Sequence, residues 1–135
     1  MRENLMVNPH AAAGFAITDG KALLLLKRKD DSTWGLPGGK AEDEETFLGC
    51  AQRETKEETG VLPNGRRLGM VESRSGNLIF KSYVMLVPER YECKLSDEHL
   101  DYDWFPLGDL TEIKLHSKLK SSKNAEGEQF SPLQE

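Results

Sequence analysis

One segment of this chain has the composition of a long helix, and it limits what the rest can form. Residues 45–59 contain no proline and consist mostly of good helix formers. Gly60 follows them, and glycine is typical of the position just after a helix. The segments on either side have strand patterns. A single long helix between two groups of strands favours an α+β domain with a mixed sheet over a regular strand–helix alternation.

Two pairs of apolar segments predict hairpins, each around a turn that contains glycine. The first pair is residues 11–18 and 21–28 around Asp19-Gly20, and the second is residues 66–75 and 77–88 around Gly76-Asn77. The stretch between the first hairpin and the helix includes WGLPGGK, residues 34–40. Its proline and paired glycines exclude a helix and predict a loop or a short strand end with exposed backbone.

The last part of the chain predicts one more strand and one more helix. Residues 101–107 have the pattern of a short strand ended by Pro106, and residues 108–120 have the spacing of a helix. After them the sequence is polar and rich in helix breakers. We therefore expect residues 1–120 to form a single domain and residues 121–135 to form a flexible C-terminal tail.

Composition excludes several classes of protein. The longest apolar run, residues 22–26, is far shorter than the about 20 residues of a membrane span, and the N-terminus lacks the pattern of a secretory signal. We expect a cytoplasmic protein in which Cys50 and Cys93 are reduced thiols. A formal net charge of -5 argues against a general nucleic-acid surface, so no DNA partner is expected.

Three acidic residues in the second half of the predicted helix point to a cation. At about 100° per residue, Glu54, Glu57 and Glu58 share one helix face, where their repulsion destabilises the helix. Carboxylate oxygens suit a hard ion, so Mg²⁺, with Mn²⁺ as a substitute, is the natural occupant. The alternative is a solvated charged face in which Arg53 and Lys56 provide ordinary ion pairs.

The residues around this cluster resemble the signature of the Nudix hydrolase superfamily. Residues 39–61, GKAEDEETFLGCAQRETKEETGV, are similar to the Nudix box G-x5-E-x7-R-E-U-x-E-E-x-G-U, where U is a bulky aliphatic residue. Thr55, at the first U position, is the one departure from the pattern. We interpret it as a packing variation that leaves activity intact, because threonine is β-branched and keeps a methyl group.

The resemblance implies a fold and a set of roles. The implied fold is an α/β/α sandwich with a central mixed β-sheet flanked by helices. The implied metal ligands are Glu54, Glu57, Glu58 and the backbone carbonyl of Gly39. Arg53 would orient these acids through Glu45, while Gly38 and Gly39 would let the loop pass close to the metal and substrate. Gly60 would end the helix.

The resemblance also implies a reaction, the hydrolysis of a phosphoanhydride bond in X-P-O-P-Y by an attacking water. Two residues are candidates for the proton acceptor: Glu54 in the box and Glu98 in the later acidic stretch SDEHLD. Arg28, at the end of the second strand, and Lys40, after the glycines, are candidates for binding substrate phosphates. Catalysis is thus assigned to Arg53, Glu54, Glu57 and Glu98.

The function predicted from the sequence is a Mg²⁺-dependent pyrophosphohydrolase acting on a nucleoside diphosphate derivative, with a (d)NTP as the first candidate. An NDP-sugar or dinucleotide pyrophosphatase is the alternative, although positions 76–78 lack the proline or tyrosine typical of members acting on ADP-ribose or diadenosine polyphosphates. A second alternative is a nucleotide-binding Nudix domain without hydrolysis. The expected partner is a small nucleotide, with no membrane association, in a monomer or homodimer.

Overall fold

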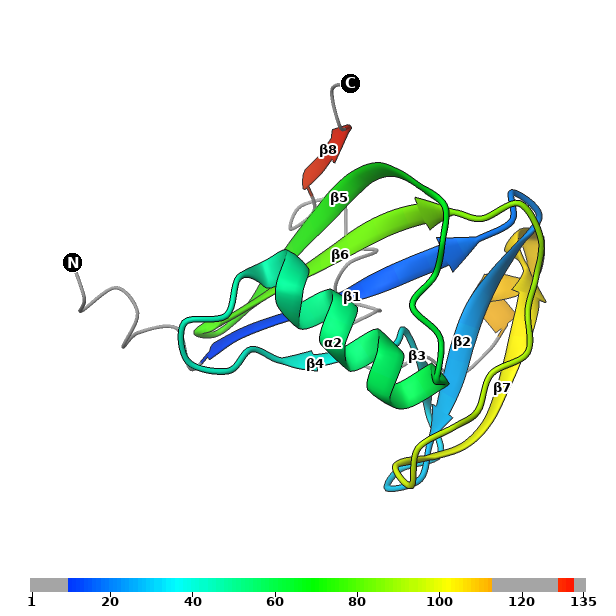
Figure 1. Cartoon of the computed structure of the whole chain (residues 1–135), viewed down its shortest axis with the longest axis horizontal. Helices are drawn as coiled ribbons and strands as arrows, with labels where there is room; N and C mark the ends of the chain where they lie inside the picture. Colours follow the sequence, from blue (N-terminus) through cyan, green and yellow to red (C-terminus); the bar gives the residue numbers. More distant parts are fainter. Residues whose placement is uncertain (1–9, 113–128, 133–135) are drawn as a thin grey trace.

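The computed structural model describes residues 10–112 and 129–132 (Figure 1). Within these ranges the chain forms one α-helix, α2 (Phe47–Thr59), a 3₁₀ helix, η2 (Leu107–Glu112), and an 8-stranded mixed sheet. The strands are β1 (Ala11–Thr18), β2 (Ala22–Arg28), β3 (Trp34–Gly35), β4 (Gly38–Lys40), β5 (Arg66–Ser75), β6 (Leu78–Leu86), β7 (His99–Pro106) and β8 (Gln129–Pro132). The expected α+β class and mixed sheet are confirmed.

The sheet is built around β1. Its main path runs β3-β2-β1-β6-β5-β8, with β4 pairing β1 and β7 pairing β2. β1 and β6 are parallel over their whole length, from Ala11 opposite Ile79 to Thr18 opposite Leu86. β5 and β6 form the predicted second hairpin, in which Gly76 adopts a positive φ of 60°. A β-bulge between Arg67 and Gly69 shifts the register of that hairpin.

The first predicted hairpin forms only at its turn. Asp19 closes the turn, since its Oδ1 accepts hydrogen bonds from the backbone N–H groups of Lys21 and Ala22, both at 2.9 Å. Beyond it the ladder of β1 and β2 is confined to Thr18 opposite Leu23. The two strands then diverge, because β4 pairs with β1 and β3 pairs with the end of β2. The predicted antiparallel hairpin is therefore confirmed, with a ladder limited to the turn.

The remaining predicted elements lie close to their expected positions. Residues 34–40 contribute β3 and β4, and β7 begins at His99 instead of residue 101. The helix predicted over residues 108–120 is a 3₁₀ helix as far as Glu112, and residues 113–120 lie outside the described part of the chain. In the predicted tail, Gln129–Pro132 forms β8 and pairs antiparallel with β5, while the rest of the tail lies outside the described residues.

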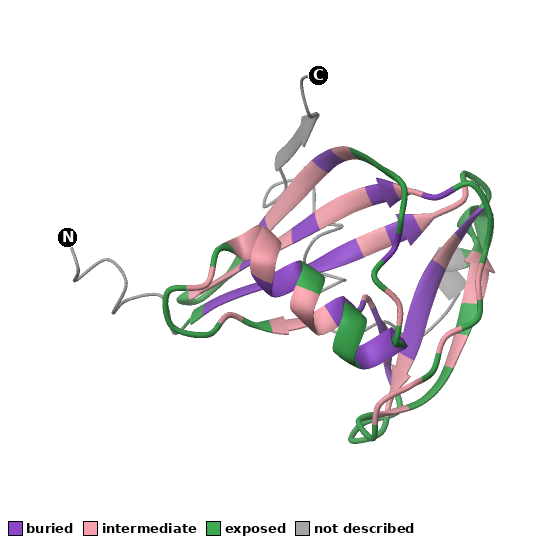
Figure 2. Ribbon diagram, viewed as in Figure 1, coloured by how far each residue is buried: buried purple, intermediate pink, exposed green. Residues whose placement is uncertain are grey.

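Helix α2 has well-defined ends and one buried side. Thr46 is the N-cap, and its hydroxyl accepts a hydrogen bond from the Gly49 N–H at 2.9 Å. Gly60 ends the helix in the left-handed conformation, with a φ of 77°. The helix packs mainly on β1 and β4, and Figure 2 shows the buried segments along β1, β2 and the helix side facing them.

The core beneath α2 combines small and large side chains. Its buried residues are Ala13, Phe15, Ile17, Leu24, Leu26, Cys50, Ala51, Met85 and Val87. Cys50 and Cys93 are free, as predicted. No helix in the described ranges is long and apolar enough to cross a membrane.

Thr55, the departure from the Nudix box, is fully buried beside this core. Its hydroxyl is one of the buried polar groups in the described chain that make no hydrogen bond. A buried hydroxyl without a partner loses its contacts with water and gains nothing in return. The methyl group of Thr55 thus fills the aliphatic position, while its hydroxyl weakens the fold.

We predict that Thr55→Val raises the free energy of unfolding by about 1 kcal/mol, because it removes an unpaired buried hydroxyl and keeps the β-branched shape. Thr59→Val is the matched control. The Thr59 hydroxyl donates to Thr55 O at 2.8 Å and accepts from the Val61 N–H at 3.1 Å, so the same substitution there lowers stability. Urea unfolding of both variants measures the difference, and destabilisation by Thr55→Val contradicts the interpretation.

The outer edge of β7 has its hydrogen-bond donors blocked. The Leu107 N–H donates to Lys21 O at 3.0 Å, so it faces β2. Because backbone N–H groups alternate in direction along a strand, those of Tyr102 and Trp104 face away from β2, and the nitrogen of Pro106 has the same orientation. The preceding residues, Asp101 and Asp103, accept the first two of these through their carboxylates, each at 2.8 Å. Pro106 has no N–H. This edge therefore offers few donors to another strand.

We predict that Asp101→Ala with Asp103→Ala increases self-association, because the Tyr102 and Trp104 N–H groups become free to pair with a strand of another copy. Sedimentation velocity over a concentration series measures this. The matched control is Asp101→Asn with Asp103→Asn, which retains the side-chain acceptors and loses only the charge. Equal association of the two double variants means that charge, rather than capping of the donors, protects the edge.

Candidate active site

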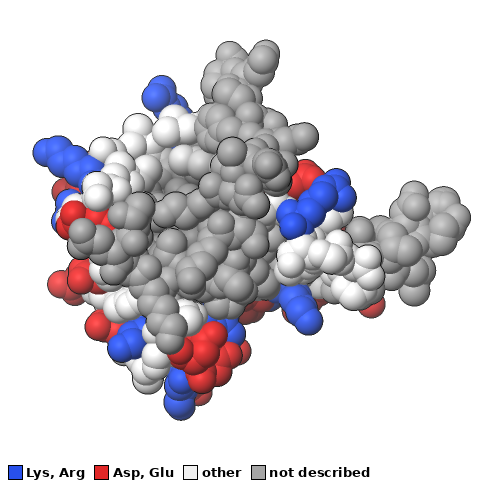
Figure 3. Space-filling view, turned by 180° about the vertical axis from the view of Figure 1, so that it is seen from behind, with Lys and Arg blue, Asp and Glu red and all other residues white. Residues whose placement is uncertain are grey.

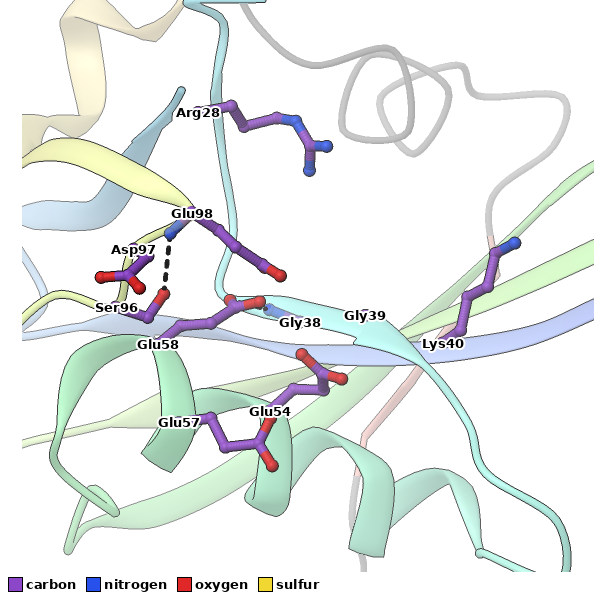
Figure 4. Close-up of a pocket in the computed structure, with 10 residues that line it drawn as sticks. All are labelled: Arg28, Gly38, Gly39, Lys40, Glu54, Glu57, Glu58, Ser96, Asp97 and Glu98. Carbon is purple, nitrogen blue, oxygen red and sulfur yellow. Dashed lines mark hydrogen bonds between the residues drawn. The ribbon is translucent and has the colours of Figure 1, made fainter. Parts of the chain in front are cut away.

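A pocket of about 560 Å³ lies where the second half of α2 faces β4 and the segment before β7 (Figure 4). This volume is within the usual range for a small-molecule site, which is roughly 300–1,000 Å³. The pocket is lined by Arg28, Gly38, Gly39, Lys40, Glu54, Glu57, Glu58, Ser96, Asp97 and Glu98. All three acids of the predicted metal cluster therefore face one space, together with the predicted glycines, both phosphate-binding candidates and Glu98.

The carboxylates of α2 approach the backbone of β4 very closely. The Gly38 N–H donates to Glu58 Oε1 at 2.9 Å. A Cβ placed on Gly39 would lie 2.6 Å from the Glu54 carboxylate, closer than real contacts allow. Figure 4 shows Glu54 and Glu58 directed at β4, with the Glu57 carboxylate farther from that strand. Glycine at position 39 is therefore required for Glu54 to occupy its place.

Arg53 holds the cluster together from the side. Its Nε and Nη2 bind both oxygens of Glu45 at 2.7 and 2.9 Å, and Nη2 also donates to Lys40 O at 3.1 Å. Its Nη1 contacts Glu54 at 3.0 Å and Glu57 at 3.3 Å. Neither Arg53 nor Glu45 lines the pocket. The guanidinium thus links the segment before the helix, the end of β4 and two of the three helix acids.

Burial sets the charge state of Glu58. Removal from water raises the pKa of this carboxyl far above its usual range, and the neighbouring Glu54 and Glu98 raise it further, against the lowering effect of the Gly38 N–H. A carboxylate that is desolvated and surrounded by other acids is stabilised in its charged form by a bound cation.

The residues present fit a divalent cation. Within the described chain no three His, Cys, Asp or Glu side chains are arranged so that they could hold a metal ion together. Arg53 forms ion pairs with Glu54 and Glu57 in this arrangement. The donors that face the pocket are nevertheless carboxylate oxygens, the ligands preferred by Mg²⁺ and Mn²⁺. The buried Glu58 has a backbone N–H as its hydrogen-bond partner, with no cationic side chain bound to it in the described residues.

Glu98 reaches the pocket on a long connection, residues 87–98, that is fixed by backbone groups. The Lys94 N–H donates to Thr59 O at 2.7 Å, and the Lys29 N–H donates to Glu98 O at 3.0 Å. Before these points in the chain, the Trp104 indole N–H donates to Tyr91 O at 3.2 Å. The connection is therefore attached to the end of α2, to β7 and to the end of β2, which places Glu98 opposite Glu58.

The two predicted phosphate-binding residues are placed differently. Arg28 lines the pocket and also forms an ion pair with Asp30 at 2.8 Å. Lys40 is exposed at the end of β4, and Figure 4 shows its amino group directed away from the acids. Gly60 lies at the end of α2, outside the pocket lining.

Two pocket residues and one supporting contact were not predicted. Ser96 and Asp97 line the pocket beside Glu98, and their position in the same polar stretch was the one available signal. The buried Cys50 thiol donates to Gly39 O at 3.3 Å. Burial raises the pKa of Cys50 to about 11, so the thiol keeps its proton and remains a donor. No spacing in the sequence indicates that contact.

Figure 3 shows the charged side chains of the described residues that are visible from the opposite side. In Figure 3 the Lys and Arg residues of the described chain are interspersed with Asp and Glu around the rim. This mixed distribution is unlike the continuous basic stripe by which proteins follow a phosphate backbone.

Comparison with known proteins identifies the class to which this fold and site belong. The family model described as NUDIX domain matches residues 8–125. The chain therefore belongs to the NUDIX family, and it is a Nudix hydrolase. Enzymes of this family generally use divalent metal ions.

Individual relatives agree with this assignment. The chain is 32% identical over 124 residues to an ADP-ribose pyrophosphatase of Methanocaldococcus jannaschii, covering 85% of this chain and 73% of that protein. It is 36% identical over 99 residues to the 8-oxo-dGDP phosphatase NUDT18 of Mus musculus, covering 69% of this chain but 30% of the mouse protein. The crystal structure of a MutT Nudix hydrolase from Burkholderia pseudomallei aligns with a TM-score of 0.64 and 29% identity, covering 85% and 96% of the two chains.

We predict that Glu45→Gln lowers the free energy of unfolding by about 1–3 kcal/mol at neutral pH, because it removes a charged partner of Arg53. Hydrogen bonds from Arg53 hold the pKa of Glu45 below its ordinary value of 4.5. The stabilisation by Glu45 is therefore complete above about pH 4.5 and disappears as the pH falls through the lowered pKa. Denaturant unfolding between pH 7 and pH 3 measures the convergence of variant and wild type.

The control for this prediction is Glu42→Gln. Glu42 is exposed and lies 3.7 Å from Arg53, so its replacement should change stability little at any of these pH values. A constant difference between Glu45→Gln and the wild type across the pH range contradicts the assigned role of the ion pair.

Proposed function

We propose that this protein is a Mg²⁺-dependent pyrophosphohydrolase that cleaves a phosphoanhydride bond in a nucleoside diphosphate derivative. The observation that carries the proposal is the convergence of Glu54, Glu57 and Glu58 on one pocket with the Gly38-Gly39 backbone and Glu98. A site of this charge attracts a diphosphate only through a divalent cation, with Mn²⁺ as a substitute for Mg²⁺.

When bound, the metal supplies charge neutralisation for the diphosphate and lowers the pKa of the attacking water. Glu54, Glu57, Glu58 and the Gly39 carbonyl hold it in this proposal. Arg53 keeps Glu54 and Glu57 oriented, and Glu45 fixes Arg53 through both carboxylate oxygens. The chain's own contribution is thus a rigid arrangement of acids at the edge of the sheet.

The placement of the side chains favours Glu98 over Glu54 as the proton acceptor. Glu54 Oε2 accepts from Arg53 at 3.0 Å, and the proposal assigns the Glu54 carboxylate to the metal, so it is less available as a base. Glu98 is exposed, its backbone carbonyl is fixed by the Lys29 N–H, and its carboxylate extends toward Glu58 in Figure 4. A base at this position is solvated and has room for a water molecule beside it.

The proposal also concerns which nucleotide derivative is the substrate. A (d)NTP remains the first candidate from the sequence. Relatives named for ADP-ribose and 8-oxo-dGDP support a nucleoside diphosphate linked to a further group as the general class. Trp34, Phe80 and Tyr83 are the aromatic residues that the sequence suggests for stacking on a base, and none of them lines the pocket. Trp34 packs on Phe105, and Tyr83 packs on Phe15.

We predict hydrolysis of at least one member of a panel containing dNTPs, 8-oxo-dGTP, 8-oxo-dGDP, ADP-ribose, an NDP-sugar and a diadenosine polyphosphate, with Mg²⁺ present. Glu57→Gln should reduce kcat on that substrate by about two to three orders of magnitude, since it removes a metal-binding charge. Chromatographic separation of the nucleotide products measures both the rate and the bond that is cleaved.

The matched control is Glu89→Gln, which neutralises an exposed acid that does not line the pocket and should leave turnover unchanged. Binding of a nucleotide without turnover would favour the alternative of a non-hydrolytic Nudix domain. Equal turnover by Glu57→Gln and wild type would remove the proposed role of the acid cluster.

A further inference from the structure

Arg28 stands where two pockets meet. It lines the candidate active site and a second pocket of about 500 Å³, whose other lining residues are Lys29, Asp30, Asp97 and Glu98. Figure 4 shows its side chain extending over the active-site pocket on the side of Glu98. The guanidinium is therefore a strong positive charge beside several carboxylates of the site.

A cation in this position would be expected to pair with those carboxylates. Glu58 is close enough to contribute to the electrostatic environment of Arg28, and Glu98 lines both pockets with it. Yet the side-chain hydrogen bonds of Arg28 in the described chain go to Asp30, from Nε at 3.1 Å and from Nη2 at 2.8 Å. Asp31 adds a longer ion pair to Nε at 3.8 Å. These contacts occupy the Nε–Nη2 edge and leave the two N–H groups of Nη1 available.

A well-defined turn holds Asp30 in place. The Arg28 N–H donates to Thr33 O at 2.8 Å, and the Ser32 N–H donates back to Arg28 O at 3.0 Å. Asp31 accepts from the Thr33 N–H at 3.0 Å and from its hydroxyl at 2.7 Å, and Ser32 adopts a positive φ of 60°. Asp30 is thus carried by a turn whose own backbone bonds fix its distance from Arg28.

We propose that Asp30 is a positioning residue that keeps the Arg28 guanidinium off Glu58 and Glu98 and presents its Nη1 edge to a substrate phosphate. The proposal rests on the proposed function for the identity of the ligand. It assigns to Asp30 two linked effects. The acids remain available to a divalent cation, and Arg28 remains available to an anion, because a guanidinium fixed along one edge offers the other in a defined direction.

Removal of Asp30 should therefore harm metal binding as well as substrate binding. In Asp30→Ala, Arg28 turns to the nearest carboxylates and competes with the cation for them. A partly exposed ion pair contributes about 0.2–1 kcal/mol, so the competition should raise the Kd for the metal by about 1.4- to fivefold. This effect requires Arg28 and disappears when the arginine is absent.

The test is a double-mutant cycle of metal binding, with no substrate present. Isothermal titration with Mn²⁺ gives the Kd of the wild type, Asp30→Ala, Arg28→Ala and the double variant. The expected result is weaker binding by Asp30→Ala, with the double variant equal to Arg28→Ala alone. If Asp30 acts only through its negative charge, it weakens binding by the same factor in both backgrounds, and the proposal is overturned.

Asp97→Ala is the matched control, since Asp97 lines the same two pockets and makes no ion pair with Arg28 in the described chain. It removes the same charge, and its effect should be equal with and without Arg28. With a hydrolysed nucleotide in hand, Asp30→Ala should raise KM more than it lowers kcat, and Asp30→Glu should recover part of the loss. An unchanged KM also contradicts the proposal.

The outcomes separate the two levels of inference. A non-additive cycle in a protein that hydrolyses no nucleotide would retain the Asp30–Arg28 coupling and remove the proposed function. An additive cycle in an active enzyme would remove the role of Asp30 alone. Failure of the wild type to bind Mn²⁺ would overturn both.

Discussion

The close approach of backbone to helix at Gly38 and Gly39 is the constraint on which the site depends. β4 is held against β1 by pairing of Gly38 with Gly14, where a Cβ on either residue would overlap the opposite backbone. On its other side β4 meets the Glu54 and Glu58 carboxylates without any intervening side chain. Small buried residues on both elements, Ala13 on β1 and Ala51 on α2, let the helix come this near. Acids and backbone carbonyls can share one ion only when no side chain separates them.

The two arginines around this contact pair with different carboxylates. Arg53 neutralises the helix acids from outside the pocket, and it is in turn fixed by Glu45. Arg28 lies within the pocket lining and is paired with Asp30 in its own turn. Each arginine therefore has a carboxylate partner outside the α2 cluster. The α2 acids keep a net negative charge, which is the condition for recruiting a divalent cation to an otherwise anionic substrate.

Much of the site and part of the fold could be predicted from the sequence. Glu54, Glu57 and Glu58 were located by their helical spacing, and Gly38 and Gly39 by the resemblance to the Nudix box. The structure gathers these five residues with Arg28, Lys40 and Glu98 in one pocket. The helix was predicted to within two residues at its start, because an uninterrupted run of helix formers and a C-terminal glycine are local signals. Local patterns of this kind depend on neighbours in the chain, which a sequence displays directly.

Contacts between segments far apart in the chain were harder to predict from the sequence. The divergence of β1 and β2 follows from the pairing of β4 with β1 and of β3 with β2, which the local hairpin signal does not contain. Ser96 and Asp97 enter the pocket because backbone bonds at Lys94 and Glu98 fix the connection before β7. The direct bonds of Arg53 to Glu54 and Glu57 likewise depend on side-chain conformations that spacing leaves open.

The backbone attachment of residues 87–98 has a consequence for how such an enzyme diversifies. The backbone of residues 87–98 keeps its path when side chains are exchanged, because the hydrogen bonds at Lys94 and Glu98 are made by main-chain atoms and need no particular residue type. Ser96 is an exception, since its hydroxyl accepts from the Glu98 N–H at 3.3 Å. The Asp97 side chain also lines the pocket, and it can be exchanged without loss of any of these bonds.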